Sequence, residues 1–171
     1  AKAKFSTIPD DIKDMELHCI GRLQRNKVKG AIQLFSCIQS VDRDELLAEL
    51  ALQCKKADMT MEVLLELHTG EDSKTGYPDF ESLARAAEQA MAYPQITLKG
   101  LMTMAPFTHD VSQIRESFRT LVEAQRFLQQ RFPELSLEIL SMGMSNDFEI
   151  AIEEGSTLLR IGTALFKGDG Q

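Results

Sequence analysis

The sequence predicts an α/β fold, a TIM-type (β/α) barrel with about six of its eight β/α units. Short strand-like apolar runs alternate with longer helical ones, which is typical of a parallel sheet with crossover helices. No glycine-rich phosphate loop follows the first strand, as it usually does in an open doubly wound sheet. A complete barrel takes ~250 residues. A chain of 171 residues is therefore short by about two units.

Six runs have the length and apolar content of strands, and Met61, Val63 and Leu65 alternate with the period of two that strands require. The predicted strands cover residues 17–20, 36–41, 61–68, 97–104, 137–142 and 157–162.

Helical spacing predicts a helix after each of the first five strands. Asp42 and Glu45 are expected to cap the second of these helices, and Pro78 is expected in the first turn of the third. Three of the predicted helices cover residues 23–34, 112–130 and 146–153. Of the other two, one begins at residue 42, and one begins at residue 78 and ends before Pro94.

Composition and charge argue against several classes of protein. The formal net charge of −7 argues against a general surface for nucleic acids or anionic membranes. Cys19, Cys37 and Cys54 are too widely spaced to suggest a disulfide framework or a metal site. No apolar run is long enough to span a membrane, and the first residues lack the apolar segment of a signal peptide. We expect a single domain over residues 1–171 in a cytoplasmic protein.

The ends of the last two strands carry the residues most suited to bind a ligand. In a barrel, the loops at this position commonly hold a phosphate group. Ser145 could donate a hydroxyl there, while Gly162 and Thr163 could offer backbone amides and a second hydroxyl. Helices beginning near Asn146 and after Thr163 would add their N-terminal dipoles. The alternative is that both segments are ordinary turns between strand and helix.

Two polar residues lie within apolar strands. Arg160 needs a partner, because burying an unpaired guanidinium is costly. The partner is either a carboxylate in a structural ion pair or an acceptor on a ligand. His18, on the first strand, is either a hydrogen-bonded core histidine or a catalytic base.

Four segments together resemble the pyridoxal phosphate homeostasis family: residues 18–29, 73–76, 99–106 and, most specifically, 140–166. The resemblance implies a barrel like the N-terminal domain of alanine racemase. It also implies binding of pyridoxal 5′-phosphate (PLP) without catalytic turnover, in a protein that keeps the pools of free cofactor and amino acids in balance.

The resemblance assigns roles to individual residues. Ser145 matches the family's phosphate-binding serine, and Gly162 with Thr163 matches its second phosphate-binding turn. Arg160 matches the arginine that faces the pyridine nitrogen. A permanently protonated guanidinium would keep that nitrogen unprotonated and so weaken the ring as an electron sink.

The chain departs from the family pattern in two places. It reads Phe166, Lys167, Gly168 where relatives have a phenylalanine followed directly by glycine. It also begins about where the helix after the family's second strand should lie, so we expect the Schiff-base lysine to be absent from it. The remaining lysines are expected to be poor substitutes; they include Lys27, Lys29, Lys74, Lys99 and Lys167.

Two other functions stay open. A PLP-dependent racemase would need the lysine, an opposing tyrosine and a second domain, and neither Tyr77 nor Tyr93 lies where that tyrosine is expected. A non-binding remnant could act through protein contacts at open strand edges. We expect the edges at 17–20 and 157–162 to promote self-association, unless they pair directly and close a narrower barrel.

Overall fold

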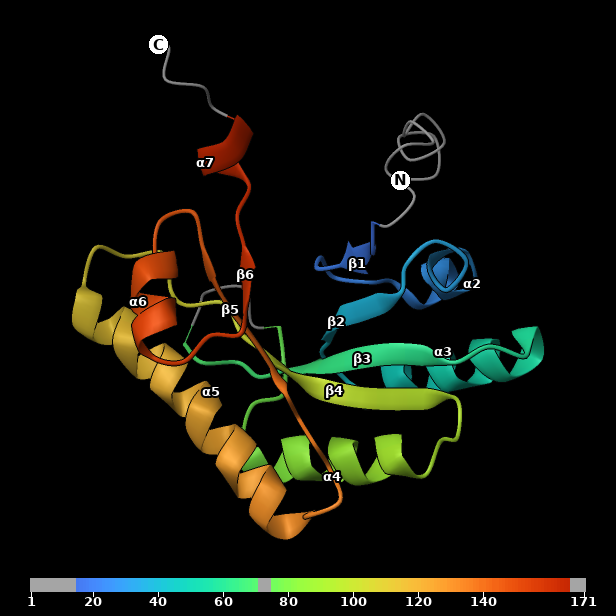
Figure 1. Cartoon of the computed structure of the whole chain (residues 1–171). Coiled ribbons are helices and arrows are strands. Elements are labelled where there is room, and N and C mark those ends of the chain that lie inside the picture. The colour runs from blue at the N-terminus through green and yellow to red at the C-terminus, as the bar shows by residue number, and fades with distance from the viewer. Residues whose placement is uncertain (1–14, 71–74, 167–171) are drawn as a thin grey trace.

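The computed structural model describes residues 15–70 and 75–166, which form one parallel sheet of six strands in the order of the sequence. Figure 1 shows the sheet curving from β1 to β6 like a barrel with one side open. The strands are β1 (His18–Cys19), β2 (Cys37–Val41), β3 (Met61–Glu66), β4 (Ile96–Met102), β5 (Ile139–Met144) and β6 (Leu158–Arg160). The predicted class of fold is confirmed. The alternative in which the first and last strands pair directly is wrong, because β1 and β6 are the two ends of the sheet.

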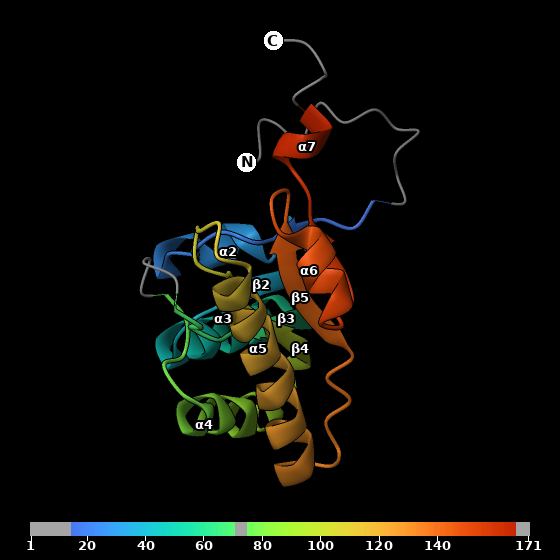
Figure 2. The same ribbon diagram turned by 90° about the vertical axis from the view of Figure 1, so that its left-hand side faces the viewer.

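Helices cover the convex face of the sheet, apart from the last one, which projects beyond the sheet (Figures 1 and 2). They are η2 (Arg25–Lys27), α2 (Val28–Ala31), α3 (Asp44–Ala57), α4 (Phe80–Met91), α5 (Val111–Arg131), α6 (Phe148–Glu153) and α7 (Thr163–Phe166). Within the described ranges, none of these helices combines the length and the apolarity that crossing a membrane would require.

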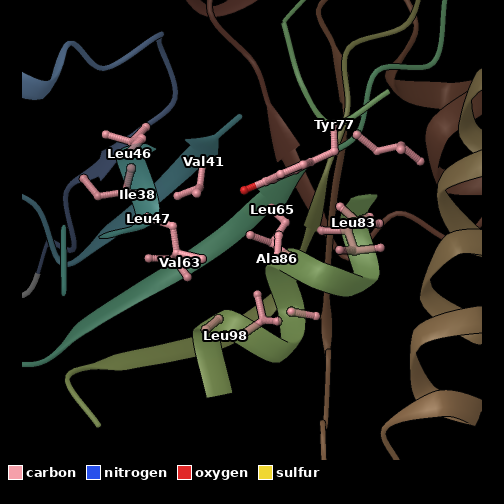
Figure 3. Close-up of a cluster of buried hydrophobic side chains, with 14 of the residues drawn as sticks. Ile38, Val41, Leu46, Leu47, Val63, Leu65, Tyr77, Leu83, Ala86 and Leu98 are labelled. Carbon is pink, nitrogen blue, oxygen red and sulfur yellow. The ribbon is translucent and has the colours of Figure 1, made fainter. Parts of the chain in front are cut away.

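The main hydrophobic core lies between the sheet and these helices. Figure 3 shows Val63 and Leu65 of β3 facing Leu47 of α3 and Ala86 of α4. These side chains are almost wholly removed from water, and burial of this kind contributes most of the stability of such a layered fold.

Two predicted helix starts are wrong for identifiable reasons. Asp42 does not cap α3, because its buried carboxylate pairs with Arg43 and lies 3.6 Å from the guanidinium of Arg22. Pro78 precedes α4 rather than starting it. The cap is Asp79, whose carboxylate accepts a 2.7 Å hydrogen bond from the backbone N–H of Ser82.

β5 begins two residues later than predicted. Leu137 has a φ of 45°, which belongs to the left-handed region and cannot continue a strand. Its side chain is nevertheless wholly buried in the core. The apolar residue that suggested an earlier strand therefore serves packing rather than sheet pairing.

The concave face of the sheet has a different composition. Along β2, Ile38 belongs to the core under the helices, so Cys37 and Gln39 face the opposite side. Cys37 packs there with Leu64 and Met102 in a small apolar cluster. Buried polar side chains lie beside this cluster, and Glu66 and Ser141 flank Met102 in the register of the sheet. The buried polar residues are Gln39, Glu66 and Ser141. The polar groups are thus gathered at the end where a barrel binds its ligand.

Candidate functional site

The loops that follow β5 and β6 meet at the C-terminal rim of the sheet. The backbone N–H of Gly162 donates a hydrogen bond of 3.3 Å to the hydroxyl oxygen of Ser145, 17 positions earlier in the chain. Thr163 follows Gly162 directly, and its side chain is exposed. The structure therefore brings together the two loops that the sequence predicted as a phosphate site.

The shape of the loop after β5 depends on Gly143. Its φ is +94°, and a Cβ atom built there would lie 2.5 Å from the Cβ of Ala151 in α6. One residue later, the N–H of Met144 donates to the carboxylate of Asp147 over 2.5 Å and closes a tight turn. Only glycine fits this position, and the turn it allows presents Ser145 at the rim.

Gly162 is different, because its backbone borders open space. A Cβ atom built at Gly162 would meet no atom within 4 Å among the described residues. The Cβ side of Gly162 is therefore open to a ligand, while its peptide N–H donates to the hydroxyl of Ser145.

Helix dipoles contribute less to this site than the sequence predicted. α6 begins at Phe148, two residues after Asn146, and has six residues; α7 has four. Helices this short align few peptide dipoles, so they add little positive potential at the rim. An anion at this site would therefore be bound mainly by hydrogen-bond donors rather than by helix ends.

Arg160 is held by neutral acceptors. One terminal N–H group donates to the hydroxyl of Ser141 at 2.7 Å, and the other donates to the backbone carbonyl of Thr103 at 2.8 Å. Within the described part of the chain, no carboxylate lies within the 4 Å of an ion pair with Arg160. Of the two partners left open by the sequence, the structural ion pair is thus not what holds this guanidinium.

The charge of Arg160 is nevertheless balanced at longer range. Burial lowers the pKa of Arg160, while the negative charges of Asp147 and Glu66 act in the opposite direction. A guanidinium remains protonated in proteins even when its pKa falls. The rim therefore contains a permanent, partly buried cation.

His18 has a hydrogen-bond partner. Its Nδ1 lies 2.8 Å from the amide Nε2 of Gln39, and its Nε2 lies 3.7 Å from the exposed carboxylate of Glu16. This geometry favours the interpretation of His18 as a hydrogen-bonded structural histidine over that of a catalytic base.

Three residues that sequence reasoning missed complete the surroundings of Arg160: Gln39, Thr103 and Ser141. All three are buried. A polar residue in a strand that is buried at every position is the signal that could have revealed Gln39, because buried polar groups need partners.

A small cavity opens at the same rim, beside the ends of β1, β3 and β4. Its volume is 360 Å³. The buried carboxylate of Glu66 accepts a 2.7 Å hydrogen bond from the hydroxyl of Thr75 at its wall. The lining residues are Ile20, Gly21, Arg22, Glu66, Thr75 and Met104.

Among the described residues, no lysine lines the cavity at this rim. Lys27 and Lys29 are exposed in η2 and α2, and the Nζ atom of Lys99, in the first half of β4, lies 3.8 Å from the carboxylate of Glu62. Lys74 and Lys167 are outside the described residues.

Comparisons with known proteins agree with this architecture. The model of the alanine racemase N-terminal domain matches residues 11–169. The pyridoxal phosphate homeostasis protein of Aquifex aeolicus is 40% identical over 163 residues, which cover 95% of this chain and 70% of that protein. Its counterpart in Vibrio cholerae is 37% identical over 153 residues, which cover 89% of this chain and 64% of that protein.

Solved structures extend the comparison. PipY of Synechococcus elongatus, solved with PLP bound, superposes with a TM-score of 0.84 at 31% identity, covering 96% of this chain and 74% of PipY. An alanine racemase of Clostridium difficile shares the fold alone, with a TM-score of 0.69 at 15% identity. The chain therefore belongs to the alanine racemase N-terminal domain family and, within it, to the pyridoxal phosphate homeostasis proteins.

Proposed function

We propose that this chain binds PLP reversibly at the rim formed by the loops after β5 and β6, and that it acts in the cytoplasm to keep PLP and amino-acid pools in balance without catalysing a reaction. The observation that carries the proposal is the hydrogen bond between Gly162 and Ser145. It joins two loops whose donors suit a phosphate group, with the cation Arg160 two residues before Gly162.

The residues present suit the parts of PLP. The phosphate would accept from the hydroxyl of Ser145 and from Thr163. It would also replace the oxygen of Ser145 as the acceptor of the peptide N–H of Gly162. The open space beside Gly162 supports this assignment, because a phosphate must approach the backbone closely. The guanidinium of Arg160 would face the pyridine nitrogen.

The choice of arginine supports a carrier rather than an enzyme. Bound PLP supplies an aldehyde that combines with amines and a ring that withdraws electrons from the adduct. An arginine donates to the ring nitrogen but gives up no proton to it, so the ring withdraws electrons less strongly. Low reactivity of this kind suits storage and delivery of the cofactor.

The relatives support the same function. Two of them are named pyridoxal phosphate homeostasis proteins, and PipY was solved with PLP. The chain spans about two thirds of the length of the two named relatives, 70% and 64%. The homeostatic role proposed for this chain is thus supported by the part of these proteins that it shares with them.

A racemase-like activity is the second candidate, supported by the likeness of fold to alanine racemase. Such an enzyme needs a second base opposite the lysine. Tyr77 is buried in the core between the sheet and the helices (Figure 3), and burial, together with the nearby charge of Asp44, raises its pKa. The hydroxyl of Tyr93 accepts a 3.2 Å hydrogen bond from Gln89 within the α4 region. Both positions favour the carrier function.

Backbone amide NMR tests the proposed site. We expect titration with PLP to shift the signals of Ser145, Gly162 and Thr163 most strongly. Pyridoxal, which lacks the phosphate, should shift these signals much less. Saturable PLP binding with the largest shifts elsewhere would refute the site, and no binding at all would favour the remnant that acts through protein contacts.

A further inference from the structure

Four side chains form a continuous hydrogen-bonded chain across the concave face of the sheet, from β6 to β1. Arg160 donates to the hydroxyl of Ser141 at 2.7 Å, and Ser141 donates to the amide oxygen of Gln39 at 2.6 Å. The amide nitrogen of Gln39 lies 2.8 Å from Nδ1 of His18. The two central members are buried, with exposed fractions of 0% for Ser141 and 2% for Gln39.

The direction of every bond in this chain follows from Arg160. A guanidinium can only donate, so Ser141 must accept from it and has its own proton left for the oxygen of Gln39. The amide of Gln39 then presents its N–H groups to His18. Nδ1 of His18 must therefore be an acceptor, and the proton of the neutral ring lies on Nε2.

The opposite arrangement leaves a group unpaired. If His18 carried its proton on Nδ1, the amide of Gln39 would have to turn and point its N–H groups at Ser141. Ser141 would then face donors from both Gln39 and Arg160, and its own proton would lose the acceptor it has in the structure. Because Ser141 is wholly buried, such a loss is unfavourable.

We propose that Ser141 and Gln39 are positioning residues for Arg160, and that they couple the orientation of its guanidinium to the tautomer of His18. Ser141 and the carbonyl of Thr103 hold two N–H groups of Arg160, so the long side chain keeps one orientation at the rim. The effect of this coupling on PLP rests on the proposed function. The coupling itself is a property of the protein without ligand.

The tautomer of His18 gives the first test, by side-chain ¹⁵N NMR on the full chain without ligand, at alkaline pH where histidine is neutral. We expect an unprotonated Nδ1 in the wild type. Ser141→Ala should shift His18 toward a mixture of tautomers, although Ser141 does not touch His18, because the amide of Gln39 is then free to turn. An unchanged His18 spectrum in Ser141→Ala would overturn the coupling.

Ser40→Ala is the matched control. Ser40 is as deeply buried as Ser141, and its hydroxyl donates to the backbone carbonyl of Gly21 at 2.7 Å, outside the chain that leads to Arg160. Loss of its hydroxyl should leave the tautomer of His18 as it is in the wild type. A change as large as that in Ser141→Ala would mean that any buried serine has this effect.

Two substitutions of Gln39 give a second test that does not depend on Ser141→Ala folding. A carboxylate in Gln39→Glu can still accept from Ser141 but can only accept at His18, so His18 should become protonated on Nδ1. Gln39→Leu removes both bonds. The proposal requires the guanidinium of Arg160 to keep its orientation in Gln39→Glu and to lose it in Gln39→Leu. The same orientation in both variants would contradict the proposal.

PLP binding separates this inference from the proposed function. We expect the dissociation constant for PLP to rise roughly tenfold in Ser141→Ala and in Gln39→Leu, and to stay near the wild-type value in Gln39→Glu and Ser40→Ala. If the wild type does not bind PLP, the proposed function fails while the His18 test still judges the coupling. If the wild type binds PLP and Ser141→Ala binds it equally well, the positioning role is wrong.

Discussion

Gly143 is the residue on which the shape of the rim loop depends most directly. Its backbone has a φ of +94°, and a Cβ atom there would lie 2.5 Å from Ala151 and 2.9 Å from Leu159. Gly155 has nearly the same φ, +93°, but nothing lies within 4 Å of its Cβ position among the described residues. The two glycines therefore separate backbone strain from steric overlap.

We expect Gly155→Ala to lower the free energy of unfolding by roughly 1–2 kcal/mol, the cost of a left-handed conformation for a residue with a side chain. Gly143→Ala should lose roughly 1–3 kcal/mol more, because overlap in a packed region adds to the strain. Urea denaturation of both variants measures the difference. Equal losses would show that α6 yields easily and that the loop is not held as described.

Lysine chemistry gives a second prediction at this scale. We expect borohydride treatment of the PLP-soaked chain, followed by peptide mass mapping, to find no lysine labelled specifically at near full occupancy. Lys27 and Lys29 are exposed on η2 and α2, and the Nζ atom of Lys99 lies 3.8 Å from the carboxylate of Glu62, so none of the three is directed at an aldehyde by the surrounding residues. A single lysine labelled at high occupancy would contradict this prediction and identify a covalent anchor.

Single residues also mark what the sequence could predict about the site. Ser145 and Gly162 were expected to meet because each follows a strand at the same edge of a parallel sheet, and that inference needs only the order of the elements. The partners of Arg160 could not be found in this way. Ser141 lies 102 positions from Gln39, and their contact depends on strand register and on the curvature of the sheet, which local patterns do not specify.

Helix α6, which follows the loop that carries Ser145, contributes only one buried residue to the core, Ala151. Ion pairs with α5 tie it to the rest of the molecule, and the two helices lie side by side in Figures 1 and 2. Arg115 donates to Glu154 at 2.5 Å and to Glu153 at 2.6 Å, and Arg119 donates to Glu154 at 2.9 Å. Charge pairing therefore supplements packing where α6 supports the loop that carries Ser145.

The pH dependence of stability tests this connection. Hydrogen bonds from Arg119 and Arg115 lower the pKa of Glu154 below its ordinary value. A carboxylate with a lowered pKa stabilises the fold above its ordinary pKa and loses that effect as the pH falls through the lowered one. We expect Glu154→Gln to be less stable than the wild type at neutral pH, with the difference closing below about pH 4.5.

Glu81→Gln is the control for this experiment. Glu81 pairs with Arg131 at 2.9 Å, but both side chains are largely exposed, so the substitution should change stability little at any pH. A difference between the wild type and Glu154→Gln that persists unchanged in acid would show that the ion pairs are not its cause.

The ends of elements were harder to predict than their existence. The alternation of apolar residues indicated all six strands, yet the starts of α3, α4 and β5 depend on the contacts and backbone conformation of individual residues. Asp42 is drawn to Arg43 instead of the helix that follows it, and Leu137 is buried in a conformation that no strand adopts. In the sequence, an aspartate that forms an ion pair looks the same as one that caps a helix, and an apolar residue buried in a loop looks the same as one in a strand.

At the scale of the whole molecule, the sheet has two ends. Among the described residues, β1 pairs only with β2 and β6 pairs only with β5. Unpaired strand edges tend to pair with another chain. We expect the chain to self-associate as its concentration rises, which sedimentation velocity would detect as a shift toward larger species. A single monomeric species at all concentrations would contradict this expectation.

The most direct test of the PLP site is an equilibrium titration of the wild type and of Ser145→Ala with PLP and with pyridoxal, which lacks the phosphate. Ser136→Ala is the control, because Ser136 is exposed and its hydroxyl donates to Glu138 at 2.6 Å. We expect Ser145→Ala to weaken PLP binding roughly tenfold or more, the value of a hydrogen bond to a charged group, and to leave the affinity for pyridoxal unchanged. Equal affinity of the wild type and Ser145→Ala for PLP would contradict a phosphate site at this rim.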